Sequence, residues 1–130
     1  MKIIINYIQL IFKLFNICLI ILYLFPGSIL GFFLYNDFSY QPQITRDIFY
    51  ISSNHIYAFS LISIIGLFAF KKKKRLFVYL VCLSIVLELF HFAIPNRSFQ
   101  IGDLNGNLLG VIIPFLIYKV YEILFKTKEE

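Results

Sequence analysis

The chain has 130 residues, of which 60% are hydrophobic and 15% charged, so it carries more apolar surface than the core of one small soluble domain can bury. The net charge of +5 does not indicate nucleic-acid binding, because five of the twelve Lys and Arg residues form one run, Lys71–Arg75, between two apolar segments. Such a run is typical of a cytoplasmic loop beside membrane spans, and the composition therefore indicates a membrane protein.

The two cysteines, Cys18 and Cys82, both lie inside apolar runs. They form no CxxC pair and have no histidine nearby at the spacing of metal ligands. The sequence therefore indicates neither a disulfide nor a zinc site, and we expect no bound metal and no cofactor.

The opening segment carries polar residues at Lys2, Asn6, Gln9, Lys13 and Asn16. Their spacing of four, three, four and three places them on one stripe of a helix. Two interpretations stay open: an amphipathic helix at the cytoplasmic interface, or the inner end of one long helix whose polar stripe faces protein. A cleaved signal peptide is disfavoured, because the apolar region is long and has no clear small-x-small cleavage site.

Four apolar segments of about 20 residues predict four transmembrane helices, and hence an all-α, polytopic helical bundle in a single domain over residues 1–130. The Pro26-Gly27 pair should kink the first span or end it early. A polar loop at 36–54, with or without a short interfacial helix, follows this span, and a short polar connection at 96–102 joins the last two. The expected spans are about Ile17 to Tyr35, His55 to Phe70, Leu76 to Ile94 and Leu104 to Phe125.

The positive residues also predict the orientation. Ten of the twelve Lys and Arg residues fall on the side of the termini and of Lys71–Arg75, including Lys126 and Lys128, and two, Arg46 and Arg97, fall on the other. Because cytoplasmic loops are enriched in Lys and Arg, we expect both termini in the cytoplasm and the 36–54 and 96–102 loops outside. The expected location is the bacterial cytoplasmic membrane, with membrane lipids as partners and no nucleic acid.

Two polar stripes mark the last two predicted spans. An ionisable side chain at the centre of a membrane helix costs on the order of 2.5–3.5 kcal/mol, so each one asks for an explanation. Both stripes have the spacing four, three, four, which places their members on one helix face. They consist of Ser84, Glu88, His91 and Pro95 in the third span, and of Asp103, Asn107, Gly110 and Pro114 in the fourth.

The predicted topology brings the ionisable residues of both stripes to the outer end of the bundle. His55, at the start of the second span, and Arg97, in the 96–102 connection, lie at the same end. We expect them to form one polar pocket at the outer leaflet. Its candidate ligand-binding residues are His55, Glu88, His91, Arg97, Asp103 and Asn107.

Three interpretations of this pocket stay open. Glu88, Asp103 and Arg97 could form a salt-bridge network that pins a helical hairpin. The pocket could bind a polar or anionic head group, with Arg97 as a bidentate clamp, His91 or Glu88 as hydrogen-bond partners, and an apolar tail between the helices. Glu88 and His91 could instead be a general acid/base pair. Binding is favoured over catalysis, because the sequence has no nucleophile motif, no metal motif and no phosphate loop.

The pattern Glu88-x-x-His91-x-x-x-Pro95-x-Arg97-x-x-x-x-x-Asp103-x-x-x-Asn107-x-x-Gly110 resembles the signature of the VanZ-like membrane proteins. The resemblance covers about residues 50 to 120. His55 is the candidate for the family's early histidine, although the Asp-Lys pair commonly seen just before it is missing and Ile51-Ser52-Ser53-Asn54 stands there instead. His91 stands where the family more often has Gln, which keeps hydrogen bonding and adds a group that can titrate.

The resemblance implies a role in the cell envelope. The founding member of the family is linked to low-level resistance to the glycopeptide antibiotic teicoplanin, and other members accompany surface polysaccharide synthesis. By that resemblance the expected ligand is an envelope lipid, a lipid-linked precursor or a glycopeptide-type amphiphile. The alternatives are an enzyme acting on a lipid-linked precursor, with Glu88 as base, and an accessory subunit of surface polysaccharide synthesis.

Overall fold

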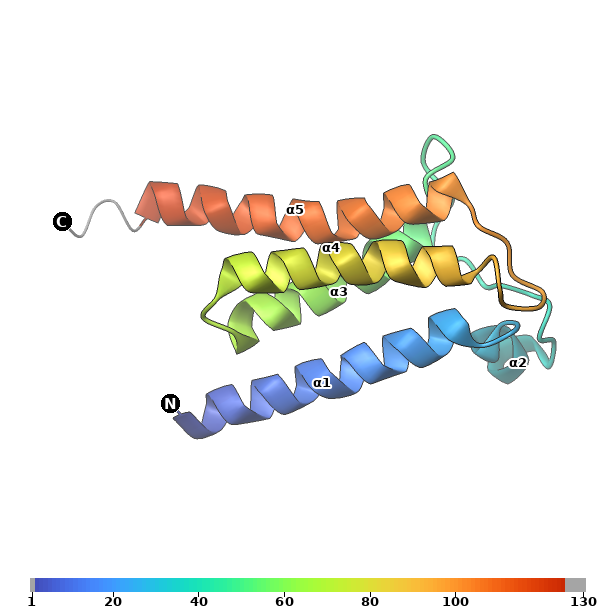
Figure 1. Cartoon of the computed structure of the whole chain (residues 1–130), viewed down its shortest axis with the longest axis horizontal. Coiled ribbons are helices and arrows are strands. Elements are labelled where there is room, and N and C mark those ends of the chain that lie inside the picture. The colour runs from blue at the N-terminus through green and yellow to red at the C-terminus, as the bar shows by residue number, and fades with distance from the viewer. Residues whose placement is uncertain (1, 126–130) are drawn as a thin grey trace.

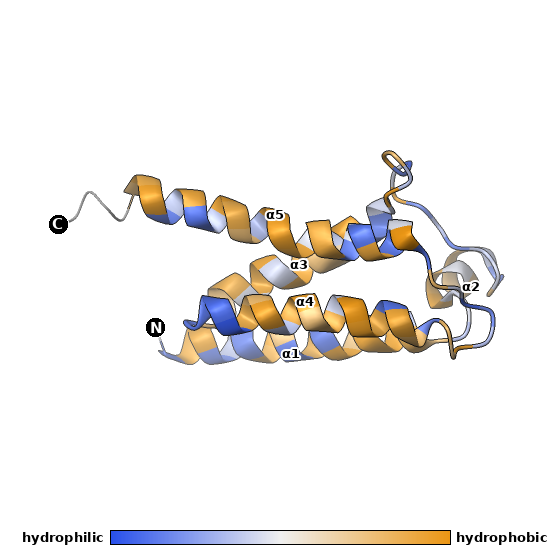
Figure 2. Ribbon diagram, turned by 45° about the horizontal axis from the view of Figure 1, so that its top comes forward, coloured by the Kyte–Doolittle hydropathy of each residue, from blue (hydrophilic) through white to orange (hydrophobic). Residues whose placement is uncertain are grey.

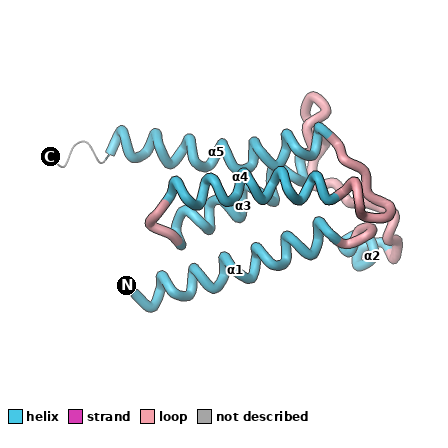
Figure 3. Tube along the Cα trace, viewed as in Figure 1, coloured by secondary structure: helices cyan, strands magenta, loops and turns pink. Residues whose placement is uncertain are grey.

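The computed structural model describes residues 2–125 and contains five α-helices and no β-strand over that range, which confirms the all-α prediction (Figure 3). Lys126 and Lys128, which contributed to the predicted orientation, lie outside the described residues. The helices are α1 (Lys2–Leu24), α2 (Ile29–Tyr35), α3 (Ser53–Ala69), α4 (Lys73–Phe90) and α5 (Ile101–Phe125).

Four of the helices, α1, α3, α4 and α5, lie lengthwise side by side and alternate in direction (Figure 1). The start of α1, the α3–α4 connection and the end of α5 lie at one end of the bundle, which we call the lysine end. The short helix α2 and the connections 36–52 and 91–100 lie at the opposite end, the loop end. Helix α3 is central, since it packs against α1, α4 and, most extensively, α5.

The first helix differs from the predicted span of Ile17 to Tyr35, because α1 begins at the start of the described chain and ends at Leu24. Pro26 has no backbone N–H and disfavours helical conformation in the residue before it, so the helix stops there. Gly27 follows with a φ of +136°, in the left-handed region that favours glycine. Helix α2 then starts separately, with Ser28 as its N-cap.

Part of the polar stripe of α1 faces protein. Gln9 Nε2 donates to the carbonyl oxygen of Ala69 at 3.0 Å, and Asn16 Nδ2 donates to the hydroxyl of Tyr79. Lys13, on the same stripe, is exposed. The segment is thus one continuous helix in which only Gln9 and Asn16 of the stripe contact protein, and both interpretations of its place at the membrane stay open.

Helices α3 and α5 match the second and fourth predicted spans to within three residues at each end. The third span was predicted to reach Ile94, but α4 ends at Phe90 and His91 is its C-cap. Glu88 and His91 still face the bundle interior, whereas Pro95 lies in an exposed turn beyond the helix and leaves the predicted stripe.

Glycines on α5 let α5 approach α3 closely. A Cβ atom added at Gly106 would lie 2.6 Å from the carbonyl oxygen of Ser52, and one at Gly110 would lie 2.6 Å from that of Ile56. These distances are below any normal contact, so the two backbones touch where side chains would otherwise separate them. The pair has the GxxxG spacing that allows close helix packing in lipid.

The 36–52 connection is tied to the first turn of α3. Asp47 Oδ1 accepts from the backbone N–H of Ser53 at 3.0 Å, and Asn54 Nδ2 donates to the carbonyl oxygen of Pro42 at 2.7 Å. No helix forms between Tyr35 and Ser53, all of which lies within the described residues. These bonds hold the loop end closed over the start of α3.

The outer surface of the bundle is largely apolar (Figure 2). Among the described residues, two helices, α1 and α5, are long and apolar enough to cross a membrane. In their most apolar stretches 17% and 22% of the residues are buried, so most of the residues in these stretches are not buried inside the bundle. Helix α3 is apolar but shorter, with 17 residues, and α4 has basic residues in its first turn.

Candidate functional site

Buried polar side chains gather near the loop end of the bundle, although the surface around them is apolar. Glu88 and Asn107 are completely buried and His91 is 2% exposed. Burying such groups is unfavourable unless they are paired, so they need partners inside the protein. We call the set the polar cluster; its members come from α1, α3, α4 with its C-cap, and α5, and are Tyr23, His55, Glu88, His91, Asp103 and Asn107.

Asn107 lies at the centre of one half of the cluster. The hydroxyl of Tyr23 donates to Asn107 Oδ1 at 2.5 Å, and His55 Nδ1 lies 3.0 Å from the same oxygen. Asn107 Nδ2 donates across to the carbonyl oxygen of Ser84 at 3.5 Å. One carboxamide therefore joins α1, α3, α4 and α5.

These contacts determine which nitrogen of His55 carries a proton. Nδ1 faces Asn107 Oδ1, which can only accept, and the hydroxyl oxygen of Tyr23 at 3.0 Å, whose own hydrogen is directed to Asn107. Nδ1 must therefore be the donor. Nε2 is left facing a carboxylate oxygen of Asp103, Oδ2, at 3.7 Å.

Glu88 forms the other half of the cluster. Its Oε1 lies 3.3 Å from His91 Nδ1 and accepts from the backbone N–H of Gln100 at 2.9 Å. His91 Nε2 lies 3.1 Å from the carbonyl oxygen of Tyr23. The second carboxylate oxygen, Oε2, is buried and has no hydrogen-bond partner within residues 2–125.

The two halves meet where His55, Glu88 and Asp103 converge. One potential ligand atom from each of the three lies within 4.8 Å of the others. The side chains of His55 and Asp103 are 14% and 19% exposed, so this point is accessible from outside, whereas Glu88 forms its buried floor. An imidazole nitrogen and two carboxylates are a set that can hold a divalent metal ion or a cationic group.

Arg97 lies apart from the oxygens of the cluster. Its Nε donates to the carbonyl oxygen of Phe25 at 3.2 Å, and its Nη2 donates to those of Leu22 and Gly27 at 3.2 and 2.6 Å. The guanidinium thus satisfies the carbonyls at the C-terminal end of α1, where a positive charge is also favoured by the helix dipole. The role of Arg97 as a bidentate clamp on a ligand, which the sequence suggested, stays a prediction.

The structure places five of the six predicted site residues together, with Arg97 beside them on the backbone of α1. Sequence reasoning missed Tyr23, because nothing in its spacing distinguishes it from the other eight tyrosines. Its ring packs against His55 and His91, with centroid distances of 5.0 and 6.0 Å. Sequence reasoning also missed Gly106, although its GxxxG spacing with Gly110 was a readable signal.

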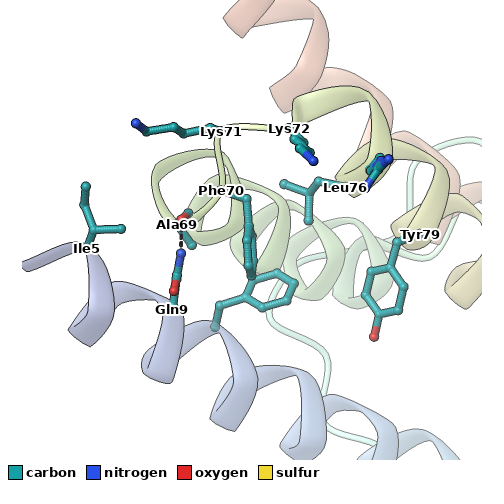
Figure 4. A pocket seen from close by; sticks show the side chains of 10 residues that line it. Ile5, Gln9, Ala69, Phe70, Lys71, Lys72, Leu76 and Tyr79 are labelled. Atoms are coloured by element: carbon teal, nitrogen blue, oxygen red, sulfur yellow. Dashed lines mark hydrogen bonds between the residues drawn. The ribbon is translucent and has the colours of Figure 1, made fainter. Parts of the chain in front are cut away.

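A cavity of about 480 Å³ opens away from the polar cluster, at the lysine end, between α1, the end of α3 and the start of α4 (Figure 4). Its walls are mainly apolar, and Lys71 and Lys72 lie along its edge. Gln9 reaches across it to Ala69. The ionisable groups here are not buried, so this cavity lacks the convergent polar groups of the loop end.

Comparison with models of known protein families, with curated proteins and with solved structures finds no match to this chain. The polar cluster offers carboxylates, imidazoles and a carboxamide that come from four helices, and its members His55 and Asp103 are partly exposed.

Proposed function

We propose that this protein is a four-span membrane protein of the VanZ-like type whose polar cluster recognises the head group of an envelope amphiphile from the outer leaflet. The observation that carries the proposal is that polar side chains lie inside the bundle and apolar side chains lie outside, the reverse of the usual arrangement in a soluble protein. Glu88, His91 and Asn107 are buried, while large apolar side chains cover the outside of α1 and α5. That distribution suits lipid as the surrounding solvent.

The arrangement of the helices supports four spans. Helices α3 and α4 lie alongside α1 and α5 over most of their length (Figure 1). If α1 and α5 cross the membrane, α3 and α4, which lie alongside them, lie at the same depth in the bilayer. Seventeen residues of α3 rise about 26 Å, close to the bilayer core of about 30 Å.

The positive charges support an orientation with the lysine end in the cytoplasm. Lys71–Arg75 lies at that end, together with the start of α1. The loop end, with the polar cluster beneath it, is then outside. An amphiphile in the outer leaflet would place its head at His55 and Asp103 and its tail along the apolar surface of the bundle.

The resemblance of the Glu88–Gly110 segment to the VanZ-like signature supports the choice of ligand class. The family's link to teicoplanin and to surface polysaccharides points to lipid-linked envelope precursors and lipoglycopeptides. Both have a polar head and an apolar tail, and both are found at the outer leaflet of the cytoplasmic membrane.

The orientation is tested by single cysteines in a background lacking Cys18 and Cys82. Cysteines placed at Gln41 and Ser98, both exposed at the loop end, should react with a membrane-impermeant maleimide in intact cells. A cysteine at the exposed Lys74 should react only after permeabilisation. Reaction at position 74 alone in intact cells would place the lysine end outside and overturn the outer-leaflet proposal.

Head-group recognition is tested by photolabelling in reconstituted vesicles. The probes carry a diazirine on the same acyl chain and a phosphate, a phosphocholine or a neutral hydroxyl head. Labelling should depend on the head group, and Glu88→Gln and Asp103→Asn should lower the preferred probe's labelling at least fivefold. Asp37→Asn, which changes an exposed aspartate outside the cluster, is the matched control. Equal labelling by all heads in all variants would overturn the proposal.

A further inference from the structure

Where His55, Glu88 and Asp103 converge, polar atoms face one another without a complementary partner. His55 Nδ1 is committed as a donor toward Asn107, and Nε2 faces Asp103 Oδ2 at 3.7 Å. In the neutral imidazole, Nε2 then carries a lone pair that faces a negative oxygen. The two repel each other unless a proton or a metal cation lies between them.

Glu88 supplies a second, independent observation. Its side chain is completely buried, and Oε2 has no hydrogen-bond partner in the part of the chain that the structure describes. An unpaired buried polar group is unfavourable, and more so when it is charged, so native structures rarely contain one without a reason. A cation bound beside this oxygen would remove the cost.

The surrounding contacts resemble the outer shell of a metal site. A histidine that binds a metal through one nitrogen usually donates its other N–H to an oxygen, as His55 Nδ1 does to Asn107 Oδ1. Carboxylate ligands are in turn oriented by hydrogen bonds, as Glu88 Oε1 is by His91 and the Gln100 N–H. One potential ligand atom of each of these two residues and of Asp103 lies within 4.8 Å of the others.

We propose that His55 Nε2, Glu88 and Asp103 bind one divalent metal ion of the Zn²⁺ or Mn²⁺ type. Ligand atoms at about 2.1 Å from one ion lie about 3.4 Å apart in tetrahedral geometry. The His55–Asp103 pair, at 3.7 Å, is close to this spacing, and the 4.8 Å limit for the three atoms requires small side-chain rotations. Mixed nitrogen and carboxylate ligands suit these ions.

Three protein ligands leave coordination positions open. This part of the inference rests on the proposed function: a phosphate oxygen of an anionic head group would occupy one of these positions. Without the ion, the carboxylates of Glu88 and Asp103 would repel such a group. The bound metal therefore explains how an acidic cluster recognises an anionic amphiphile.

Metal binding is measured directly on the full chain in detergent, purified without a polyhistidine tag, in the background lacking both cysteines and after removal of metals with EDTA. Zn²⁺ and Mn²⁺ are titrated against a chromophoric chelator, and the bound metal is counted by mass spectrometry. We expect one ion per chain. Glu88→Gln, Asp103→Asn and His55→Gln should each weaken binding at least tenfold, with Asp37→Asn as the control.

Two outcomes would overturn the metal site: no stoichiometric ion on the wild-type chain between pH 6.5 and 8, or equal affinity in folded Glu88→Gln protein. Size-exclusion chromatography and circular dichroism show which variants are folded. If no variant is folded, the stoichiometry of the wild-type chain decides whether the metal site exists.

Photolabelling repeated with EDTA separates this inference from the proposed function. Head-group-dependent labelling that a chelator leaves unchanged overturns the metal's role alone, whereas metal binding without head-group dependence overturns recognition alone.

Discussion

The two ends of the bundle are built differently. Near the loop end, α5 meets α3 backbone to backbone: a Cβ added at Gly110 would meet Ile56 O at 2.6 Å and Phe59 Cβ at 2.7 Å. At the lysine end, the closest neighbours of a Cβ at Gly66 are the ends of the Leu76 and Phe12 side chains, at 2.8 and 2.9 Å. Backbone cannot move aside as side-chain tips can, so the loop end is the rigid one.

The polar side chains also differ between the two ends of the bundle. Around the polar cluster they are buried and bond to one another across four helices. At the lysine end they face the surface or close a helix end, as Lys73 does by donating to the carbonyl oxygens of Leu67 and Phe70. A rigid, pre-organised polar site is what selective binding requires, because less entropy is lost when the ligand binds.

The largest effect should come from Gly110→Ala. Replacing glycine within a helix with alanine gains up to about 1 kcal/mol in helix propensity, but overpacking a close contact typically costs about 1–3 kcal/mol and occasionally more. Because the methyl group would meet backbone, we expect a net loss of about 2 kcal/mol in the free energy of unfolding. SDS titration in mixed micelles measures it, and unchanged stability would show that α3 and α5 are not in close contact.

An effect of comparable size is expected from Asn107→Ala. The substitution leaves the Tyr23 hydroxyl and His55 Nδ1 without their shared acceptor, which costs about 1–3 kcal/mol for buried groups. Asn105→Ala, an exposed position on the same helix, should change stability by less than about 0.5 kcal/mol. Equal effects of the two substitutions in the same titration would mean that Asn107 does not join the helices.

The smallest effect should come from Gly66→Ala. Here the methyl group meets flexible side-chain ends, and the gain in helix propensity of up to about 1 kcal/mol offsets the packing cost. We expect a change within about 1 kcal/mol of zero, in either direction. If Gly66→Ala were as destabilising as Gly110→Ala, the difference in rigidity between the two ends would be refuted.

Much of the secondary structure was predictable because its signals are local. Apolar length and the Lys71–Arg75 run separated α3, α4 and α5, and Pro26 indicated a break in the first apolar region. The exact ends were less predictable. Helix α4 ends at Phe90, and the Glu88 carboxylate accepts from the Gln100 N–H in the connection that follows, a contact that no local pattern predicts.

The helical period determined which polar residues share a face, and together with the topology predicted from the positive residues it indicated that Glu88, His91, Asp103 and Asn107 belong to one site. The tertiary structure alone decided what each does there. It added Tyr23 from α1, directed Arg97 to backbone carbonyls, and left Nε2 of His55 and Oε2 of Glu88 without hydrogen donors over residues 2–125. Periodicity specifies direction around one helix, whereas partners and unsatisfied atoms depend on distances between helices, which the sequence encodes only through packing.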